Sequence, residues 1–253
     1  MHYKNNIMNK INRINHIYVI CHKEKEADKY DKWVKWIEYN KIPEDYISFY
    51  CYKWGDELSE EDIKNYSLDD GTLVKLFPFR RQFPLKRSEI SLSINFLNVF
   101  KLALEKKQEY ILVFESDAIL HPDFMKLINS HMTELFETYS NWHMFSIGAG
   151  MNKHFPKIKK NKHIYLAKEI RCLDSFVINE RGMKLILDNL KKVKIPIDEH
   201  LDILVKTNKL FLLWLEPTIV VQGSQTGINP TTVRYSNSIY VDNCEWLKDV
   251  KFK

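Results

Sequence analysis

The stretch YILVFESDAILHPDF, residues 110–124, decides the fold. Its first five residues, 110–114, are aromatic or aliphatic and are typical of a buried β-strand. Two carboxylates follow, Glu115 and Asp117, with Ser116 between them. Residues two apart on a strand point to the same face, so the two acids converge near the carboxyl end of the strand. Ligands usually bind at that end of the strands in an α/β sheet. The stretch therefore predicts a strand that carries a binding site.

Strand and helix patterns alternate on either side of this stretch. HIYVIC (16–21) and DYISFYCY (45–52) are typical of strands, and the segment between them has apolar residues at helical spacing. SEISLSINFLNVFKLALEKKQ (88–108) predicts a core helix that leads into the strand at 110–114. A β-α-β start is typical of nucleotide-binding sheets, so the sequence predicts an α/β fold. Further strands are predicted within 142–150, 172–179 and 210–227, and further helices within 121–139, 180–193 and 195–208.

The chain length and composition favour one domain. The 253 residues, 45% of them hydrophobic, are enough to bury a sizeable core. The sequence contains no internal repeat and no low-complexity linker, so we expect a single domain over residues 1–253. Within it, residues 1–15 are expected to form a flexible N-terminus and residues 230–253 a C-terminal wrap.

The charge pattern limits the partners. The formal net charge of +5 is mild, although basic residues gather at 80–87 and 157–163. Such runs are typical of solvated surface loops; alternatively, they attract an anionic ligand such as a diphosphate. No nucleic-acid-binding motif and no long basic stripe occur, so nucleic acid is not an expected partner.

The cysteines and the N-terminus bear on the compartment. The four cysteines are scattered without CxxC spacing, which gives no support to a zinc or redox motif. No apolar h-region precedes Ile17, and no window approaches 18 consecutive apolar residues. We therefore expect neither a signal peptide nor a transmembrane segment, and a cytoplasmic location. Peripheral membrane contact through the basic loops is left open.

The acidic pair has two interpretations. Neighbouring carboxylate oxygens at Glu115 and Asp117 suit Mg²⁺ or Mn²⁺, whose other ligands are water and phosphate oxygens. A cation that bridges a diphosphate would neutralise the charge that builds on a nucleotide leaving group. Alternatively, Asp117 is the N-cap of the next helix. Spacing alone does not separate the two.

The order of segments around the pair resembles glycosyltransferase family 25, the lipooligosaccharide and procollagen galactosyltransferase-like group. The resemblance implies a GT-A-type fold, which is a Rossmann-like mixed sheet flanked by helices. It also implies a nucleotide-sugar donor, most typically UDP-galactose or UDP-glucose, and Mn²⁺ or Mg²⁺ as cofactor. Five segments carry the resemblance: the one that runs from SEISL to DAIL (88–120), WHMFSIGAG (142–150), DSFVINERGMKLIL (174–187), IPID (195–198) and WLEPTIVVQGSQTG (214–227).

The resemblance assigns roles to the acids. Glu115 and Asp117 correspond to the ends of the family's acidic triplet, which makes them the metal residues, with Asp117 as the direct ligand. Ser116 stands where the family has a middle Asp. Asp174 and Asp198 are both candidates for the general base that deprotonates the acceptor hydroxyl. Asp198 also follows a proline turn, where a helix N-cap is common.

Further polar residues are candidates for donor binding. His22 lies, between Cys21 and Lys23, where the family carries an arginine-containing donor loop, and the arginine is missing here. The segment after the last predicted strand supplies amide and hydroxyl groups and a flexible glycine that suit sugar or diphosphate oxygens. An ordinary surface loop is the alternative. These residues are Gln222, Gly223, Ser224 and Gln225.

The sequence thus predicts a metal-dependent glycosyltransferase. It would move a hexose from a UDP-sugar to a hydroxyl of a glycan or protein acceptor, and the resemblance implies inversion at the anomeric carbon. Ser116 and the missing arginine motivate an alternative, a catalytically silent relative that binds carbohydrate or protein. A third reading is a metal-dependent phosphohydrolase.

Overall fold

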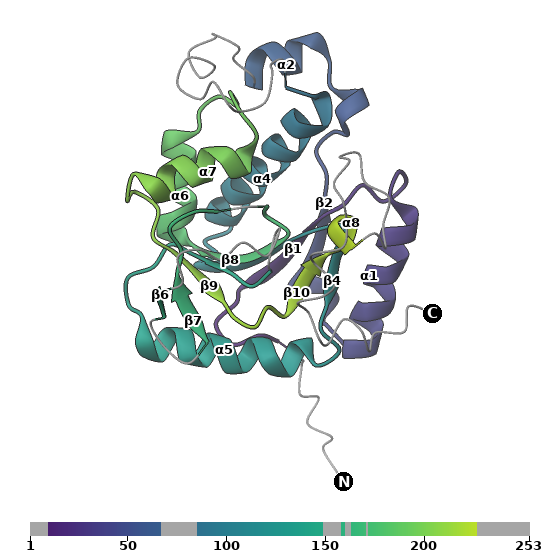
Figure 1. Cartoon of the computed structure of the whole chain (residues 1–253). Helices are drawn as coiled ribbons and strands as arrows, with labels where there is room; N and C mark the ends of the chain where they lie inside the picture. Colours follow the sequence, from purple (N-terminus) through teal and green to yellow (C-terminus); the bar gives the residue numbers. More distant parts are fainter. Residues whose placement is uncertain (1–9, 67–84, 149–157, 160–162, 171, 227–253) are drawn as a thin grey trace.

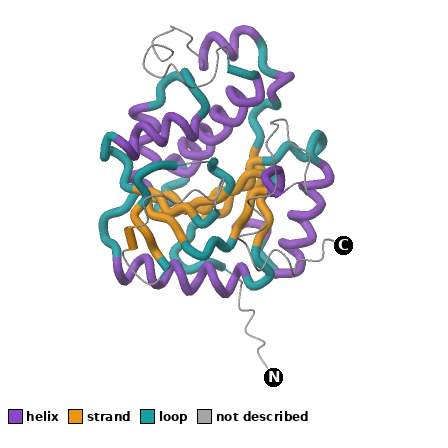
Figure 2. The backbone as a smooth tube through the Cα atoms, viewed as in Figure 1, coloured by secondary structure: helices purple, strands orange, loops and turns teal. Residues whose placement is uncertain are grey.

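The strand predicted at 110–114 lies inside a large mixed β-sheet. The computed structural model describes residues 10–66, 85–148, 158–159, 163–170 and 172–226. Within that part, eight strands form one sheet in the order β2-β1-β3-β8-β5-β9-β7-β6, and a two-stranded antiparallel sheet joins β4 and β10 (Figure 1; strands orange in Figure 2). The strands of the large sheet are β1 (His16–Ile20), β2 (Ile47–Tyr50), β3 (Tyr110–Glu115), β5 (Met144–Ser146), β6 (Ile158–Lys159), β7 (Ile164–Leu166), β8 (Ser175–Asn179) and β9 (Leu212–Leu215); those of the small sheet are β4 (Ala118–Leu120) and β10 (Val220–Gln222).

Strand directions make the sheet mixed. β1 pairs in parallel with β2, as the β-α-β pattern predicts, and also in parallel with β3. β8 then runs antiparallel to both β3 and β5, and β9 is again parallel to β5. The antiparallel β8 brings the residue before it beside the carboxyl end of β3. This register positions the site described below.

Helices cover both faces of the sheet. On one face, Leu112 and Phe114 of β3 share a buried cluster with Trp33 of α1 and Phe124 of α5. On the other, Ile111 and Val113 belong to a cluster with residues of α4, α6 and α7 (Figure 1). A strand covered on both faces is apolar throughout, which explains the continuous run at 111–114. The helices are α1 (Ala27–Asn40), α2 (Glu60–Tyr66), α4 (Arg87–Glu105), α5 (Phe124–Thr138), α6 (Glu180–Asn189), α7 (Ile197–Lys206) and α8 (Gly223–Thr226), with 3-10 turns η1 (Glu44–Tyr46) and η2 (Gly55–Glu57).

The predicted α/β fold is confirmed: it is a mixed sheet flanked by helices. Of the N-terminal stretch expected to be flexible, residues 1–9 lie outside the described residues. Ile11 and Ile14, by contrast, are buried in the cluster that contains residues of α1 and α5. The expected wrap at 230–253 also lies outside them. Across the described ranges, no helix combines the length and the apolar character needed to cross a bilayer.

Candidate active site

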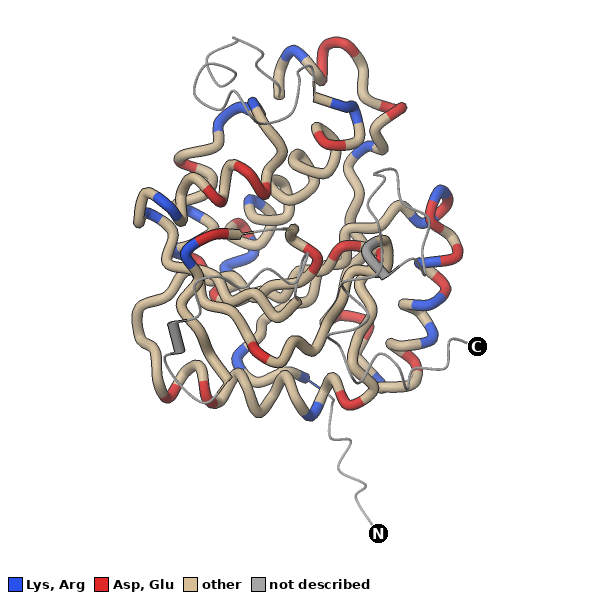
Figure 3. The backbone as a smooth tube through the Cα atoms, in the orientation of Figure 1, with Lys and Arg blue, Asp and Glu red and all other residues tan. Residues whose placement is uncertain are grey.

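Four carboxylates gather at the carboxyl end of β3. Glu115 ends that strand, Asp117 follows in the turn to β4, Asp174 directly precedes β8, and Asp198 lies in the first turn of α7. Burial, and then the negative charges of Asp117, Asp174 and Asp198, raise the pKa of Glu115 well above its usual value. The fold therefore brings together all four acids that the sequence singled out. We call these four residues the acidic cluster; Figure 3 shows acidic segments, in red, beside α8.

The β3–β8 register holds one side of the acidic cluster. The backbone N–H of Glu115 donates to the carbonyl oxygen of Asp174 at 2.9 Å, which extends the ladder one step beyond the pair Phe114–Ser175. The side chain of Asp174 is 1% exposed, and its Oδ2 accepts from the Ser175 hydroxyl at 3.3 Å. Asp174 is thus a fixed, buried member of the cluster.

Gly148, just after β5, makes room for that buried carboxylate. A Cβ at this position would lie 1.8 Å from Asp174 Oδ2 and 2.4 Å from Ser175 Oγ. Real Cβ atoms do not approach other atoms that closely, so any side chain here would displace Asp174. Packing against the site therefore explains Gly148, the first of the small residues at the end of the predicted strand 142–150.

The segment β10–α8 closes the other side of the acidic cluster. The Gln222 side-chain amide donates from Nε2 to Glu115 Oε2 at 3.0 Å. The backbone N–H of Gly223 donates to the Asp117 carbonyl at 2.8 Å, and that of Ser224 to Asp117 Oδ2 at 3.0 Å. Three of the four residues predicted in this loop thus contact the acidic pair. The fourth, Gln225, lies in α8, and its side chain lies outside the described part.

Ser116 points to the opposite side of the strand, toward α1. Its hydroxyl donates to Glu26 Oε1 at 2.6 Å, and its carbonyl oxygen accepts from Trp33 Nε1 at 2.9 Å. Lys29 Nζ donates to the same Glu26 oxygen at 2.6 Å and lies 3.4 Å from Ser116 Oγ. Glu26 therefore places a carboxylate next to Ser116, the residue that stands where the resemblance implies a middle Asp.

Lys29 is a cation beside the acidic cluster that the sequence analysis missed. Burial lowers its pKa, but the hydrogen bond to Glu26 and the charges of Glu26 and Asp117 outweigh burial and raise the pKa above its usual value. The ammonium group also lowers the pKa of Glu115, although less than the acids raise it. A basic residue in the KEKEADK segment was visible in the sequence, but only the packing of α1 against β3 places one of them here.

His22 does not join the acidic cluster through any contact that the structure describes. It follows β1 as predicted, but its Nδ1 accepts from the Lys25 N–H at 3.2 Å, and its Nε2 lies 3.4 Å from Glu57 Oε1. Its backbone N–H donates to Glu26 Oε2 at 3.1 Å. These contacts organise the turn from β1 into α1, so His22 has a local structural role in this state of the protein.

Cys172 is a neighbour of the acidic cluster that the sequence did not indicate. Burial, followed by the charges of Asp174, Asp198, Glu115 and Asp117, raises the pKa of its thiol well above the usual value. The thiol is therefore uncharged at neutral pH, and it adds no further negative charge to the site.

The donor set suits a hard divalent cation. Carboxylate oxygens are the ligands that Mg²⁺ and Mn²⁺ prefer, and the raised pKa of Glu115 reflects negative charge that Lys29 only partly offsets. Gln222 Oε1 is buried and has no hydrogen-bond partner among the described residues, so it is one further oxygen available beside Glu115. The site could therefore hold a cation together with an anionic ligand.

A mixed sheet with an acidic cluster at the strand ends is compatible with the glycosyltransferase fold that the resemblance implies. The sequence profile of glycosyltransferase family 25, described as an LPS biosynthesis protein, matches residues 74–201, about half of the chain. The chain belongs to this family and is a glycosyltransferase. The matched region contains all four members of the acidic cluster, and it ends before β10 and α8. A comparison with curated proteins gives no match.

Three solved structures are similar at low identity. A glycosyltransferase involved in the glycosylation of the major capsid of PBCV-1 is 12% identical with a TM-score of 0.33, over 68% of this chain and 65% of that one. A197 from STIV is 12% identical with a TM-score of 0.37, over 82% and 83%. An apo UDP-glucose pyrophosphorylase is 11% identical with a TM-score of 0.36, over 79% and 72%. At these TM-scores the likenesses add no argument to the family match.

Proposed function

We propose that this family 25 glycosyltransferase moves a hexose from UDP-galactose or UDP-glucose to a hydroxyl group of a glycan or protein, with inversion at the anomeric carbon, and uses Mn²⁺ or Mg²⁺. One observation carries the proposal: four carboxylates from three separate segments converge at the carboxyl end of β3, where burial and then the charges of the other three acids raise the pKa of Glu115. Nucleotide ligands bind at that end of such sheets.

Asp117 and Glu115 are the residues that would hold the cation. When bound there, a divalent cation supplies positive charge that stabilises the diphosphate as it leaves. Backbone donors fix Asp117 before any ligand arrives, because its carbonyl oxygen accepts from the Gly223 N–H and its Oδ2 from the Ser224 N–H. A pre-positioned carboxylate needs little reorganisation to bind its ligand, which favours Asp117 as the direct one.

Lys29 would contribute a second, permanent positive charge. Its side chain is 18% exposed, and its ammonium group is paired with Glu26, whose side chain is 8% exposed. A lysine ammonium is a compact point charge that commonly contacts phosphate. We therefore assign to Lys29 part of the charge that the missing arginine of the donor loop would have provided.

Asp198 is the better candidate for the general base. It is partly exposed at the start of α7, whereas Asp174 is buried beneath Gly148 and bonded to Ser175. A base must reach the acceptor hydroxyl, which arrives from solvent. In the proposed reaction, the acceptor oxygen bonds to the anomeric carbon while the bond to UDP breaks on the opposite face, and Asp198 takes the hydroxyl proton. Asp174 then acts by keeping the strand ends in place.

Donor turnover tests the proposal. The protein is incubated with a panel of UDP-sugars and Mn²⁺, and release of UDP is measured for wild type, Asp117→Ala and the matched control Asp123→Ala. Asp123 is an exposed acid only six residues away, at the start of α5. We expect turnover by wild type and Asp123→Ala, and a loss of about 100-fold or more in Asp117→Ala, the scale of removing one transition-state contact.

Two other results would favour the alternative functions. Absence of turnover for every donor in the panel would leave the carbohydrate- or protein-binding relative as the better account. Release of phosphate from simple phosphate esters, without any need for an acceptor, would favour the phosphohydrolase instead.

A further inference from the structure

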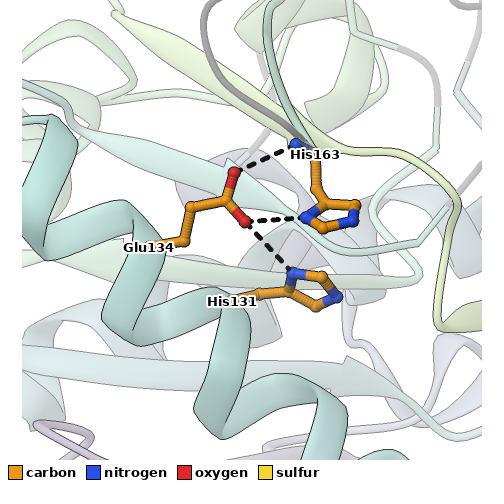
Figure 4. Close-up of side chains that lie close together, drawn as sticks. All are labelled: His131, Glu134 and His163. Atoms are coloured by element: carbon orange, nitrogen blue, oxygen red, sulfur yellow. Dashed lines mark hydrogen bonds and ion pairs between the residues drawn. The ribbon is translucent and has the colours of Figure 1, made fainter.

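A second cluster of titratable side chains lies between α5 and the start of β7. It consists of His131 and Glu134, one helical turn apart on α5, and His163, the residue before β7. Their ligand atoms all lie within 4.8 Å of one another, and in the described part of the chain this is the one such set. Figure 4 shows both imidazole rings directed at the same carboxylate. The acidic cluster plays no part in it.

The distances between the ligand atoms suit a small cation with tetrahedral coordination. His163 Nδ1 lies 2.8 Å from Glu134 Oε2, and His131 Nδ1 lies 3.7 Å from the same oxygen. In a tetrahedral zinc site with bonds of about 2.0–2.1 Å, neighbouring ligand atoms lie about 3.3 Å apart. The two measured distances bracket that value. Small side-chain rotations would therefore bring the three atoms to coordination distance.

Hydrogen bonds within the protein do not account for the position of His131. Its side chain is almost fully buried, and its Nδ1 has no hydrogen-bond partner among the described residues. The distance of 3.7 Å to Glu134 is too long for a hydrogen bond. Buried polar atoms normally have a partner. The unpartnered nitrogen points at the carboxylate that His163 already contacts, which is where an ion would lie.

We propose that His131, Glu134 and His163 bind one Zn²⁺ ion through the Nδ1 atoms of the two histidines and the carboxylate of Glu134. Two imidazoles and one carboxylate favour Zn²⁺ over Mg²⁺ or Mn²⁺, which prefer all-oxygen sites. Three protein ligands leave the fourth tetrahedral position to water. The ion replaces the proton shared by His163 and Glu134, which is released to solvent.

The site would link α5 to the edge of the main sheet. The His163 N–H already donates to Glu134 Oε1 at 3.0 Å, and its carbonyl oxygen accepts from the Glu216 N–H, just after β9, at 2.9 Å. An ion at this point joins the helix to both β7 and the end of β9. Because it binds only the folded state, it would raise the stability of the protein by mass action.

Metal binding to the intact chain tests the proposal. Zinc content after dialysis is measured by mass spectrometry, and affinity by competition with a chromogenic chelator, in an Asp117→Ala background that removes binding at the acidic cluster. We expect the parent to bind one equivalent of Zn²⁺. In Glu134→Gln and His163→Ala we expect a Zn²⁺ affinity at least about 100-fold weaker, because losing even a residue that only supports a metal ligand costs up to that much. His121→Ala is the matched histidine control and should bind like its parent.

A spectroscopic measurement covers variants that fold poorly. Co²⁺ in place of Zn²⁺ in the unaltered chain should give the intense visible absorption of a tetrahedral nitrogen–oxygen site, and excess Zn²⁺ should abolish it. Octahedral all-oxygen sites absorb far more weakly. The proposal is overturned if the chain retains no Zn²⁺, if Co²⁺ gives only the weak octahedral spectrum, or if Glu134→Gln and His163→Ala, shown to be folded, bind as tightly as the parent.

Discussion

Glu115 is the residue at which the chemistry of the site and the stability of the fold conflict. Burial and three neighbouring acids make its ionised form unfavourable, and Lys29 offsets this only in part. Proteins keep such groups where a ligand compensates the charge. In the free protein the same group must cost stability, because its pKa lies above that of the unfolded chain, which is about 4.3.

The sign of the resulting pH dependence follows from linkage. With the folded pKa raised, the folded state binds the proton more tightly, so stability is greatest below the unfolded pKa and falls as pH rises through the folded pKa. Glu115→Gln removes the charge and retains an amide oxygen that can accept from Gln222. We expect the variant to have the higher melting temperature near pH 7, and the difference to shrink toward about pH 4. Thermal unfolding in metal-free buffer measures it; a variant no more stable than wild type at neutral pH would contradict the account.

Ser116 is one of the two places where the chain departs from the pattern that the resemblance implies, and its contacts give a reason. The hydroxyl donates to Glu26, so an Asp at 116 would place a second carboxylate against the first. We expect Ser116→Ala to cost about 1–2 kcal/mol, for one part-buried hydrogen bond to a charged group, and to retain donor turnover. Ser116→Asp should cost more.

A double-mutant cycle in urea unfolding checks the origin of that cost. If repulsion between positions 26 and 116 is responsible, Glu26→Gln should reduce the penalty of Ser116→Asp, with a clear coupling energy. Equal penalties in both backgrounds would exclude the repulsion. A large loss of turnover in Ser116→Ala, by contrast, would mean that the hydroxyl serves the site itself.

At the scale of elements, the packing of β5 against the start of β8 sets the position of Asp174. Gly148→Ala places a methyl group into the Asp174 carboxylate, so we expect a loss of about 1–3 kcal/mol of stability from overpacking and a marked fall in turnover. Gly182→Ala, in α6, is the matched control, because its Cβ would lie 2.6 Å from the carbonyl oxygen of His143. It should lose comparable stability and keep its activity, measured at a temperature where both variants are folded. Equal activity of the two would contradict the positioning role.

The elements also show what sequence patterns can predict. The apolar run at 110–114 and the segments around it predicted β3, the β-α-β unit of β1, α1 and β2, and the long helix α4, because period and length are local properties. The antiparallel insertion of β8 is not local. SFVIN has Phe, Val and Ile in succession and is buried on both faces, so its pattern is the same for either direction.

At the scale of the molecule, the residues of the acidic cluster could be predicted because they lie at one strand end or in a segment that carries the family resemblance. Glu115 and Asp117 share a strand end, and the resemblance added Asp174 and Asp198. Lys29 enters only because α1 packs against β3. The His22 ring contacts the turn after β1, and its role in donor binding stays a prediction. The cluster of His131, Glu134 and His163 joins residues 29 positions apart, which no spacing rule connects.

Ligand-linked stability tests the whole assembly, because it requires the fold, the acidic cluster and the metal together. With Mn²⁺ present and UDP at 100 times its dissociation constant, mass action adds about 2.7 kcal/mol. For a chain of this size each kcal/mol raises the melting temperature by about 2–4 °C, so we expect a rise of about 5–11 °C. UDP without metal should give less, and Asp117→Ala should give almost none. Glu134→Gln should respond to UDP and Mn²⁺ like wild type, since its cluster contributes no residue to the acidic site. An equal rise in wild type and Asp117→Ala would show that UDP binds elsewhere, and the assignment of the acidic cluster as the donor site would then be wrong.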